Sequence, residues 1–246
     1  MLKPSNDSKT RLSPNQKNTF GLLPGPQGTC PFATTGCGGC WAPLKEGNKT
    51  NACYVDRLMR ARPNVRRLLE FNTELMKRLG EDLLVKVLEQ EFQRFLDAED
   101  LSDPTYVPLY RLHWSGDIFS RTYARALTTA MSKFPKIKFW IYTRAWEYVD
   151  VSMLKLENLS FLLSLDPCNI EQGLSWRQKY RNPTKSKIGI SFMGTEIPER
   201  LSTYAEKEKI SVLACPVDSG NMSLEGGCQK CKACIHQRNN VIFFKT

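Results

Sequence analysis

Apolar positions change their period along the chain, and this change predicts where helices and strands lie. Residues 63–79 and 81–98 carry apolar side chains at helical spacing, with Gly80 between the two segments. Short apolar runs typical of buried strands then follow one another. They span residues 107–114, 137–143, 161–165, 188–193 and 210–214, and a shorter run at 19–23 precedes them all.

Helix-length segments separate these runs, at residues 121–134, 148–156, 170–180 and 198–207. Strands that alternate with helices predict a parallel sheet with helical crossovers. We therefore expect an α/β fold, a partial (βα)6 TIM-like barrel with parallel strands over residues 19–214. Residues 1–18 are polar, basic and rich in Pro, Asn and Ser, which predicts a disordered tail.

Composition and charge narrow the class of protein. With 246 residues and 41% hydrophobic content, the chain is long enough for one domain with a full core. No apolar run approaches the ~20 residues that span a membrane. Because no secretory signal opens the chain either, we expect a soluble cytoplasmic protein without a membrane partner.

The net charge of +10 permits nucleic-acid binding. The basic runs 57–67 and 177–187 are either solvated faces or parts of a nucleic-acid groove.

Eight of the nine cysteines form two groups at opposite ends of the chain. The groups are Cys30, Cys37, Cys40 and Cys53, in a loop at residues 30–53, and Cys215, Cys228, Cys231 and Cys234, in a C-terminal segment at 215–246. Four nearby thiolates are what a tetrahedral zinc or an iron–sulfur cluster requires. Disulfides are less suited, because they typify small secreted domains with little core. The ninth, Cys168, is expected to be a buried small hydrophobe.

The spacing of the cysteines bears on the identity of the metal. In the C-terminal group, two CxxC steps share Cys231 and a Cys-Pro lies at a distance, as in ferredoxin ligand runs. Zinc ribbons instead separate two CxxC pairs by a loop, so the pattern favours [4Fe–4S] over zinc. The N-terminal group is less regular. Either Cys53 completes a four-thiolate cluster, or three cysteines ligate and leave one iron open to substrate.

Polar groups follow four of the predicted strands. Ser115, Gly116 and Asp117 follow the run at 107–114, and Arg144 follows the run at 137–143. Ser164 lies near the end of the run at 161–165, and Thr195 and Glu196 follow the run at 188–193. Strand ends are often polar because they meet solvent. The carboxyl ends of parallel strands also share one rim, where sites of this fold collect, and a glycine beside a carboxylate permits close approach of the backbone to a ligand.

Two side chains at this rim have open roles. His113 is either a core residue with its hydrogen bonds satisfied, or a group that contacts a cluster or transfers protons near neutral pH. Arg144 either clamps a carboxylate or phosphate, or pairs with Asp117 or Asp166. His236, beside Cys234, is expected at the surface.

Several motifs together resemble one phage family. They are Cys30-Pro31, Cys53-Tyr54, LHWSGDIF at residues 112–119, FWIYTRAW at 139–146 and the terminal cysteine run. In this combination the chain is similar, over about residues 19–246, to the family named after gene product 88. The resemblance implies a phage protein acting in the cytoplasm of the infected host cell, and it implies no particular reaction.

The chain also resembles the radical S-adenosylmethionine (SAM) superfamily. The similarity lies in six βα units, a three-cysteine loop after the first strand, Ser115-Gly116-Asp117 in place of a Gly-Gly-Glu-like motif, and a C-terminal cysteine extension. The usual CxxxCxxC is replaced by Cys30-x6-Cys37-x2-Cys40. The resemblance implies that Asp117 holds the methionine amine of S-adenosylmethionine, that Arg144 or Ser164 holds its carboxylate or ribose, and that an electron donor is a partner.

Three functions remain open from the sequence. The first is a radical SAM-like enzyme with two [4Fe–4S] clusters. The second is a non-catalytic redox or binding protein whose clusters are fully ligated by cysteine. The third is a zinc protein that binds nucleic acid through its basic runs. Iron–sulfur binding is common to the first two, and the sequence indicates neither a substrate nor an oligomeric state.

Overall fold

The computed structural model describes residues 1–9, 13, 15–34, 53–184, 188–235 and 241–245. Its centre is a six-stranded sheet in the order β1-β2-β3-β4-β6-β5, and each neighbouring pair is parallel. The strands are β1 (Leu109–Arg111), β2 (Lys138–Thr143), β3 (Leu159–Leu165), β4 (Ile188–Gly194), β5 (Val212–Ala214) and β6 (Val241–Lys245). The predicted α/β class with parallel strands is therefore confirmed. The sheet is open, because β1 and β5 lie at opposite edges.

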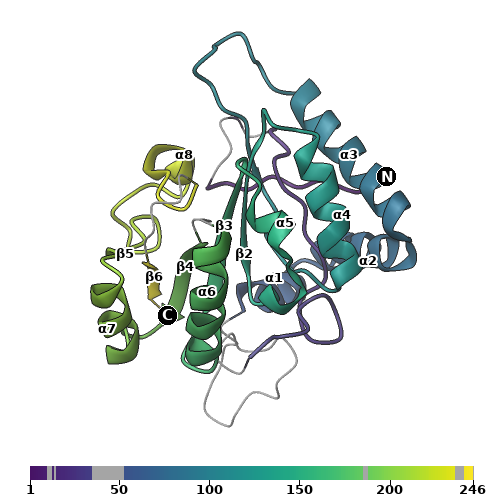
Figure 1. Cartoon of the computed structure of the whole chain (residues 1–246). Coiled ribbons are helices and arrows are strands. Elements are labelled where there is room, and N and C mark those ends of the chain that lie inside the picture. Colours follow the sequence, from purple (N-terminus) through teal and green to yellow (C-terminus); the bar gives the residue numbers. More distant parts are fainter. Residues whose placement is uncertain (10–12, 14, 35–52, 185–187, 236–240, 246) are drawn as a thin grey trace.

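Helices precede and connect the strands, and most of the long ones pack on one face of the sheet. They are α1 (Tyr54–Ala61), α2 (Pro63–Arg78), α3 (Glu81–Asp97), α4 (Arg121–Ser132), α5 (Val151–Leu154), α6 (Ile170–Thr184), α7 (Glu199–Lys207) and α8 (Gly227–Cys231). Figure 1 shows α3 and α4 on one side of the sheet and α8 on the other. The periodicity predicted α2 and α3 to within a residue or two. Pro63 occupies the first turn of α2, and Gly80 precedes α3 as its N-cap.

Side-chain alternation along the strands separates the two faces of the sheet. In β3, Phe161 and Leu163 are buried in the main core, where Phe161 stacks on Trp176 of α6. Ser160 and Ser164 point to the other face, because successive side chains of a strand alternate. One face is thus a conventional apolar core, and the other carries polar groups beside two smaller apolar clusters.

Three parts of the fold differ from the sequence-based expectations. β6 was not predicted, and it inserts between β4 and β5 although it is the last strand of the chain. α1 and α8 were also not predicted. The strand expected at residues 107–114 is only three residues long, because His113 adopts a left-handed backbone conformation with φ of 58° that ends the extended geometry.

The segment at residues 19–23 lies along the outer edge of β1. Thr19 forms a parallel bridge with Arg111, the amide of Trp114 donates to the Phe20 carbonyl at 3.2 Å, and the amide of Leu22 donates to the Ser115 carbonyl at 2.8 Å. Phe20 and Leu22 are fully buried. The short strand predicted here exists as an extended segment that protects the β1 edge.

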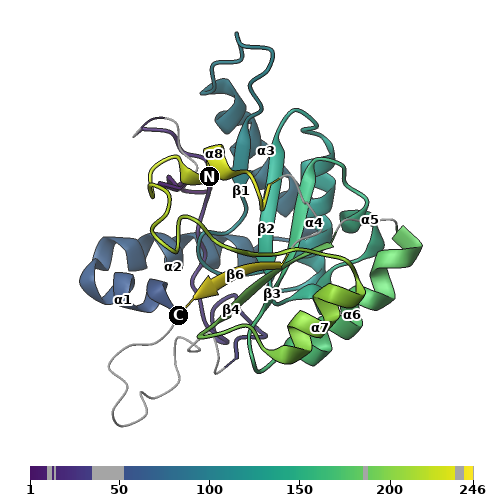
Figure 2. The same cartoon turned by 90° about the vertical axis from the view of Figure 1, so that its left-hand side faces the viewer.

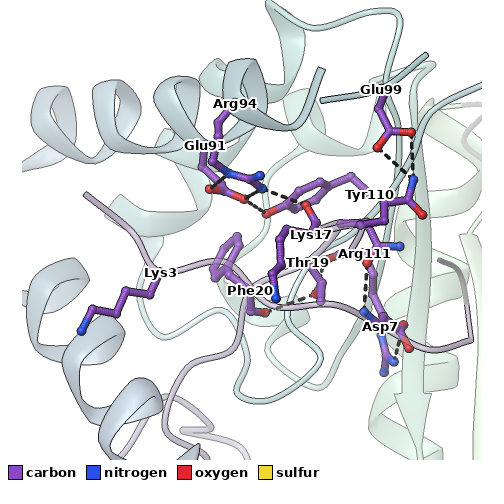
Figure 3. A network of polar contacts seen from close by, with 12 residues as sticks. Lys3, Asp7, Lys17, Thr19, Phe20, Glu91, Arg94, Glu99, Tyr110 and Arg111 are labelled. Atoms are coloured by element: carbon purple, nitrogen blue, oxygen red, sulfur yellow. Dashed lines mark hydrogen bonds and ion pairs between the residues drawn. The ribbon is translucent and has the colours of Figure 1, made fainter. Parts of the chain in front are cut away.

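The described residues of the segment 1–18 lie against the domain, although the sequence predicted a disordered tail. Leu2 is buried, the amide of Asp7 donates to the Asn18 side chain at 2.9 Å, and Asp7 forms an ion pair with Arg111 of β1 at 3.0 Å. Figure 3 shows this ion pair beside the buried Glu91 and its partners. Composition could not reveal this order, because it comes from contacts with residues about a hundred positions away in the chain.

Candidate metal and cofactor site

A cavity of about 1100 Å³ lies on the face of the sheet that carries the polar side chains. Six described cysteines line it: Cys30, Cys53, Cys215, Cys228, Cys231 and Cys234. The fold therefore brings members of both predicted groups to one cavity. Cys37 and Cys40, the other two predicted ligands, lie outside the described residues.

The C-terminal cysteines are placed by β5 and by the short helix α8. Cys215 directly follows β5, α8 carries Cys228 and Cys231, and Lys232 ends α8 in a left-handed turn that leads to Cys234. Figure 2 shows α8 in front of the sheet. The four thiols thus approach the sheet face from two segments that are joined by a glycine-containing loop.

Cys215 is buried, and the other three cysteines of this group are partly buried. Burial raises the pKa of Cys228 to about 12 and that of Cys234 to about 11. A hydrogen bond from the Tyr142 hydroxyl lowers the pKa of Cys234, whereas the charges of Cys215 and Cys231 raise it further. Cys234 therefore lies within electrostatic range of the other three thiols. Cys228 and Cys234 are protonated at neutral pH in the metal-free protein, and binding a metal would release their protons.

The described cysteines share a cavity without forming a single-ion site. In the part of the chain that the structure describes, no three Cys, His, Asp or Glu side chains are grouped so that they could hold a metal ion. A tetrahedral zinc with Zn–S bonds of ~2.3 Å needs its sulfurs within ~4 Å of one another. A [4Fe–4S] cluster binds each thiolate at a different iron, so its sulfurs are spread more widely. The donor type suits both metals.

Asp117 joins the ends of β1 and β2 and also lines the cavity. Its carboxylate accepts hydrogen bonds from the Thr143 hydroxyl at 2.5 Å, the Arg144 amide at 2.8 Å and the Ile118 amide at 2.7 Å. Burial raises the pKa of Asp117 to about 6, although these hydrogen bonds oppose the shift. A carboxylate accepts about four hydrogen bonds, so one position is left for a ligand.

Ser115 and Gly116 hold chain segments together at the rim. The Ser115 hydroxyl donates to the Leu22 carbonyl at 2.8 Å. A Cβ atom on Gly116 would lie 2.4 Å from Thr29 Oγ1, and the φ of this glycine is +85°. Gly116 therefore permits close approach of the loop around Leu22 and Thr29, and the expected close approach of a ligand is not what requires it.

Arg144 takes the second of its two expected roles. Its guanidinium pairs with the fully buried Asp166 at 3.0 Å. Asp166 also accepts from the Thr34 hydroxyl at 2.5 Å and from the Cys168 amide at 2.8 Å. Arg144 and Ser164 both line the cavity, so the predicted rim is real even though the arginine already has a carboxylate partner.

His113 is a buried, neutral imidazole at the wall of the cavity. Its Nε2 lies 2.7 Å from the Tyr123 hydroxyl, and its ring meets Phe20 edge to face. Burial, with a smaller contribution from Arg111, lowers the pKa of His113 to about 3. His113 therefore carries no charge at neutral pH, and at that pH it cannot act as a general acid through a protonated imidazole.

Two expectations about single residues are corrected. Cys168 is exposed rather than buried, and it lies outside the cavity lining. In the basic run 177–187, Arg177 is fully buried and donates to the Ile188 carbonyl and the Tyr204 hydroxyl, both at 2.7 Å. This arginine joins α6, β4 and α7 and is not part of a solvated basic face. His236 lies outside the described residues.

Sequence reasoning missed an N-terminal contribution to the site. Asp7 and Lys9 line the cavity with Arg111, and the Lys9 carbonyl accepts from the Cys228 amide at 2.8 Å. The signal that could have found Arg111 is a lone cation inside an apolar strand, which requires a partner once it is buried. No comparable local signal marks Asp7.

These features define an α/β protein with an open parallel sheet and a cysteine-lined cavity on one face. A sequence profile of the family described as Gene product 88 matches residues 1–237, and the chain belongs to this family. The "Gene 88 protein" of Mycobacterium phage L5 is 28% identical over 235 residues, which cover 93% of this chain and 87% of the relative. The protein of the same name from Mycobacterium phage D29 matches with the same identity and coverage. No solved structure matches the chain.

The family resemblance inferred from the motifs is thereby confirmed. The names of these relatives describe no activity, so the chemistry of the site has to be argued from its residues. Among the described residues, no helix is both long and apolar enough to cross a membrane.

Proposed function

We propose that this protein binds iron–sulfur clusters at the cavity, through the two cysteine groups. The observation that carries the proposal is that six cysteines from opposite ends of the chain line one cavity. All six are free thiols, so disulfides do not account for cysteines separated by up to 204 positions, Cys30 to Cys234, lining one space. Two [4Fe–4S] clusters account for eight cysteine ligands, four for each cluster.

Several features favour clusters over zinc. The spacing Cys228-x2-Cys231-x2-Cys234, with Cys215-Pro216 at a distance, resembles ferredoxin ligand runs more than zinc ribbons. The Tyr142 hydroxyl, a donor to the sulfur of Cys234, supplies the kind of hydrogen bond that tunes cluster potentials. Zinc held by these cysteines is the second candidate for the metal.

Catalysis is the finer part of the proposal. If the open sheet is a partial TIM-like barrel, the cavity face would be its interior, and the rim residues lie at the carboxyl ends of the strands, where sites of that fold collect. If Cys53 is not a ligand, the N-terminal cluster keeps an open iron and would supply an electron to bound S-adenosylmethionine. The remaining acceptor position of Asp117 would orient its amine, and Ser164 its carboxylate or ribose. If Cys53 is a ligand, the protein is a non-catalytic redox or binding protein.

The decisive experiment is a count of iron, acid-labile sulfide and zinc per chain, on protein purified without oxygen from a host cell. Two clusters predict about eight irons and eight sulfides. The double variant Cys228→Ser/Cys231→Ser should lose about half of both, and the control Cys168→Ser should lose none. Zinc without sulfide would overturn the iron–sulfur proposal.

A second measurement separates the two cluster readings. Cys53→Ser should change the electronic and paramagnetic resonance spectra of the N-terminal cluster if Cys53 is a ligand. Unchanged spectra would support an open iron, and reductive cleavage of S-adenosylmethionine could then be assayed with a chemical or protein electron donor.

A further inference from the structure

Positive charge is concentrated on two neighbouring helices. Residues 54–78, which form α1 and α2, include seven Lys or Arg and three Asp or Glu. The next helix, α3, has the reverse balance, with five acidic and two basic residues. Figure 2 shows α1 and α2 together at one side of the molecule. A segregated charge of this kind creates a local field for an anionic partner.

Three arginines of this surface are available to a partner. Arg60 and Arg66 pair with the carboxylates one turn along their helices, at 3.0 and 2.8 Å. Arg57, Arg62 and Arg67 are exposed, and none of the three forms an ion pair with another described residue. Exposed cations without local carboxylates keep their full charge for phosphate groups.

The basic surface is continuous with the cavity. Arg57 lines the cavity together with Tyr54, one turn earlier in α1. The Tyr54 hydroxyl donates to the Trp114 carbonyl, and this contact fixes the ring while 48% of the residue stays exposed. An aromatic face held in place beside cations is the arrangement on which an unpaired base stacks.

We propose that the α1–α2 surface binds single-stranded nucleic acid, with phosphates on Arg57, Arg62 and Arg67 and one base stacked on Tyr54. A single strand is favoured over a duplex because stacking on Tyr54 requires a base that is free of its neighbours. The inference goes beyond metal binding, because none of its residues is one of the proposed cysteine ligands. It would place a nucleic-acid strand at the entrance to the cysteine-lined cavity.

The test is fluorescence anisotropy of a labelled single-stranded oligonucleotide of about 12 nucleotides, measured with the full chain at several salt concentrations. Arg57→Gln/Arg62→Gln/Arg67→Gln should weaken binding about tenfold or more. It should also reduce the slope of log K against log salt by ~2, since three single-strand contacts are lost. The matched control is Arg125→Gln/Lys133→Gln/Arg200→Gln, which removes the same charge from cations paired elsewhere on the surface. The control should keep the wild-type slope.

Tyr54 supplies a second, uncharged test. Tyr54→Leu should weaken binding about five- to a hundredfold through the loss of stacking, whereas Tyr54→Phe keeps the ring, loses only the hydroxyl contact with Trp114 and should retain most of the affinity. Iron content is measured on each variant, so a failure of metal binding is recognised separately. A protein that lacks iron but binds the oligonucleotide overturns only the proposed function.

Three results would overturn the surface proposal. The first is no binding even at low salt. The second is an equal loss of affinity in the two triple variants, which would reflect net charge alone. The third is equally tight binding of poly-glutamate of matched charge, which would indicate a surface for an acidic protein.

Discussion

The two faces of the sheet are built in different ways, although the same strands supply both. On the helix-covered face, Phe161 of β3 packs with neighbours of the main core. On the cavity face, the Ser160 hydroxyl of the same strand donates to the carbonyl of Ile235, which lies 75 positions along the chain. The first face rests on apolar burial, which tolerates approximate geometry. The second rests on individual polar contacts and thiols, each of which needs a particular partner.

The largest expected effect comes from breaking the apolar face. Phe161→Ala should lower the free energy of unfolding by about 3–5 kcal/mol, because it leaves a cavity in the main core. Ser164→Ala, three residues along the same strand on the other face, should change it by less than about 0.5 kcal/mol. Urea denaturation of both metal-free variants measures the contrast. Equal losses would mean that the cavity face is also part of the cooperative core.

The second effect is a pH dependence from Asp117. Its folded pKa of about 6 lies above the ordinary value of ~3.9, so the folded state binds the proton more tightly than the unfolded state. The carboxyl group thus contributes stability below pH ~4 that is lost as the pH rises through about 6. The stability difference between the wild type and Asp117→Asn should fall by about 3 kcal/mol between pH 3 and pH 7.

Urea denaturation at the two pH values checks this prediction. The matched control is Asp100→Asn, which removes an exposed carboxylate whose pKa is lowered by hydrogen bonds to Ser102. Because the folded pKa of Asp100 is lowered rather than raised, the stability difference between the wild type and Asp100→Asn should rise slightly over the same pH range. A difference for Asp117 that stays constant with pH would show that this carboxyl group has the same pKa in the folded and unfolded states.

The third effect concerns the rim, where segments from distant parts of the chain meet. Gly116→Ala should cost about 2–3 kcal/mol, from the positive φ and from the collision of the new Cβ with Thr29. Gly220→Ala separates these two causes. Gly220 also has a positive φ, +76°, but a Cβ there would meet nothing within 4 Å, so it should cost only ~1 kcal/mol. Equal costs would mean that the rim relaxes around the added methyl group.

The helix-covered face could be predicted largely from the sequence, because its signals are local. The 3.6-residue period and the break at Gly80 defined α2 and α3, and the short apolar runs defined β2, β3 and β4. The apolar run at residues 241–245 was not recognised as a strand, and such a run would in any case not indicate its neighbours in the sheet. The insertion of β6 between β4 and β5 depends on contacts along the sheet and not on local pattern.

The cavity face could be predicted only in part. The rim residues were predicted because strand ends must converge in a parallel sheet, and Asp117 and Arg144 both line the cavity. The Asp7–Arg111 ion pair could not be found, because its members are 104 positions apart and Asp7 lies in a segment of polar composition. Long-range polar pairs leave no periodic signal, and sites are rich in them.

The smallest effect tests how the cavity face prepares its thiols. Tyr142→Phe removes the hydroxyl that donates to the Cys234 sulfur and should cost less than about 1 kcal/mol of stability in the metal-free protein. The same hydroxyl lowers the pKa of Cys234, so the variant should ionise this thiol at a higher pH than the wild type. Thiolate absorbance during a pH titration of metal-free protein measures the shift, and Cys234→Ser identifies the signal. Since a metal binds the thiolate, Tyr142→Phe should also bind iron or zinc more weakly at neutral pH. An unchanged titration would mean that burial alone controls the thiol, and that the polar contacts of this face position the cysteines without tuning their charge.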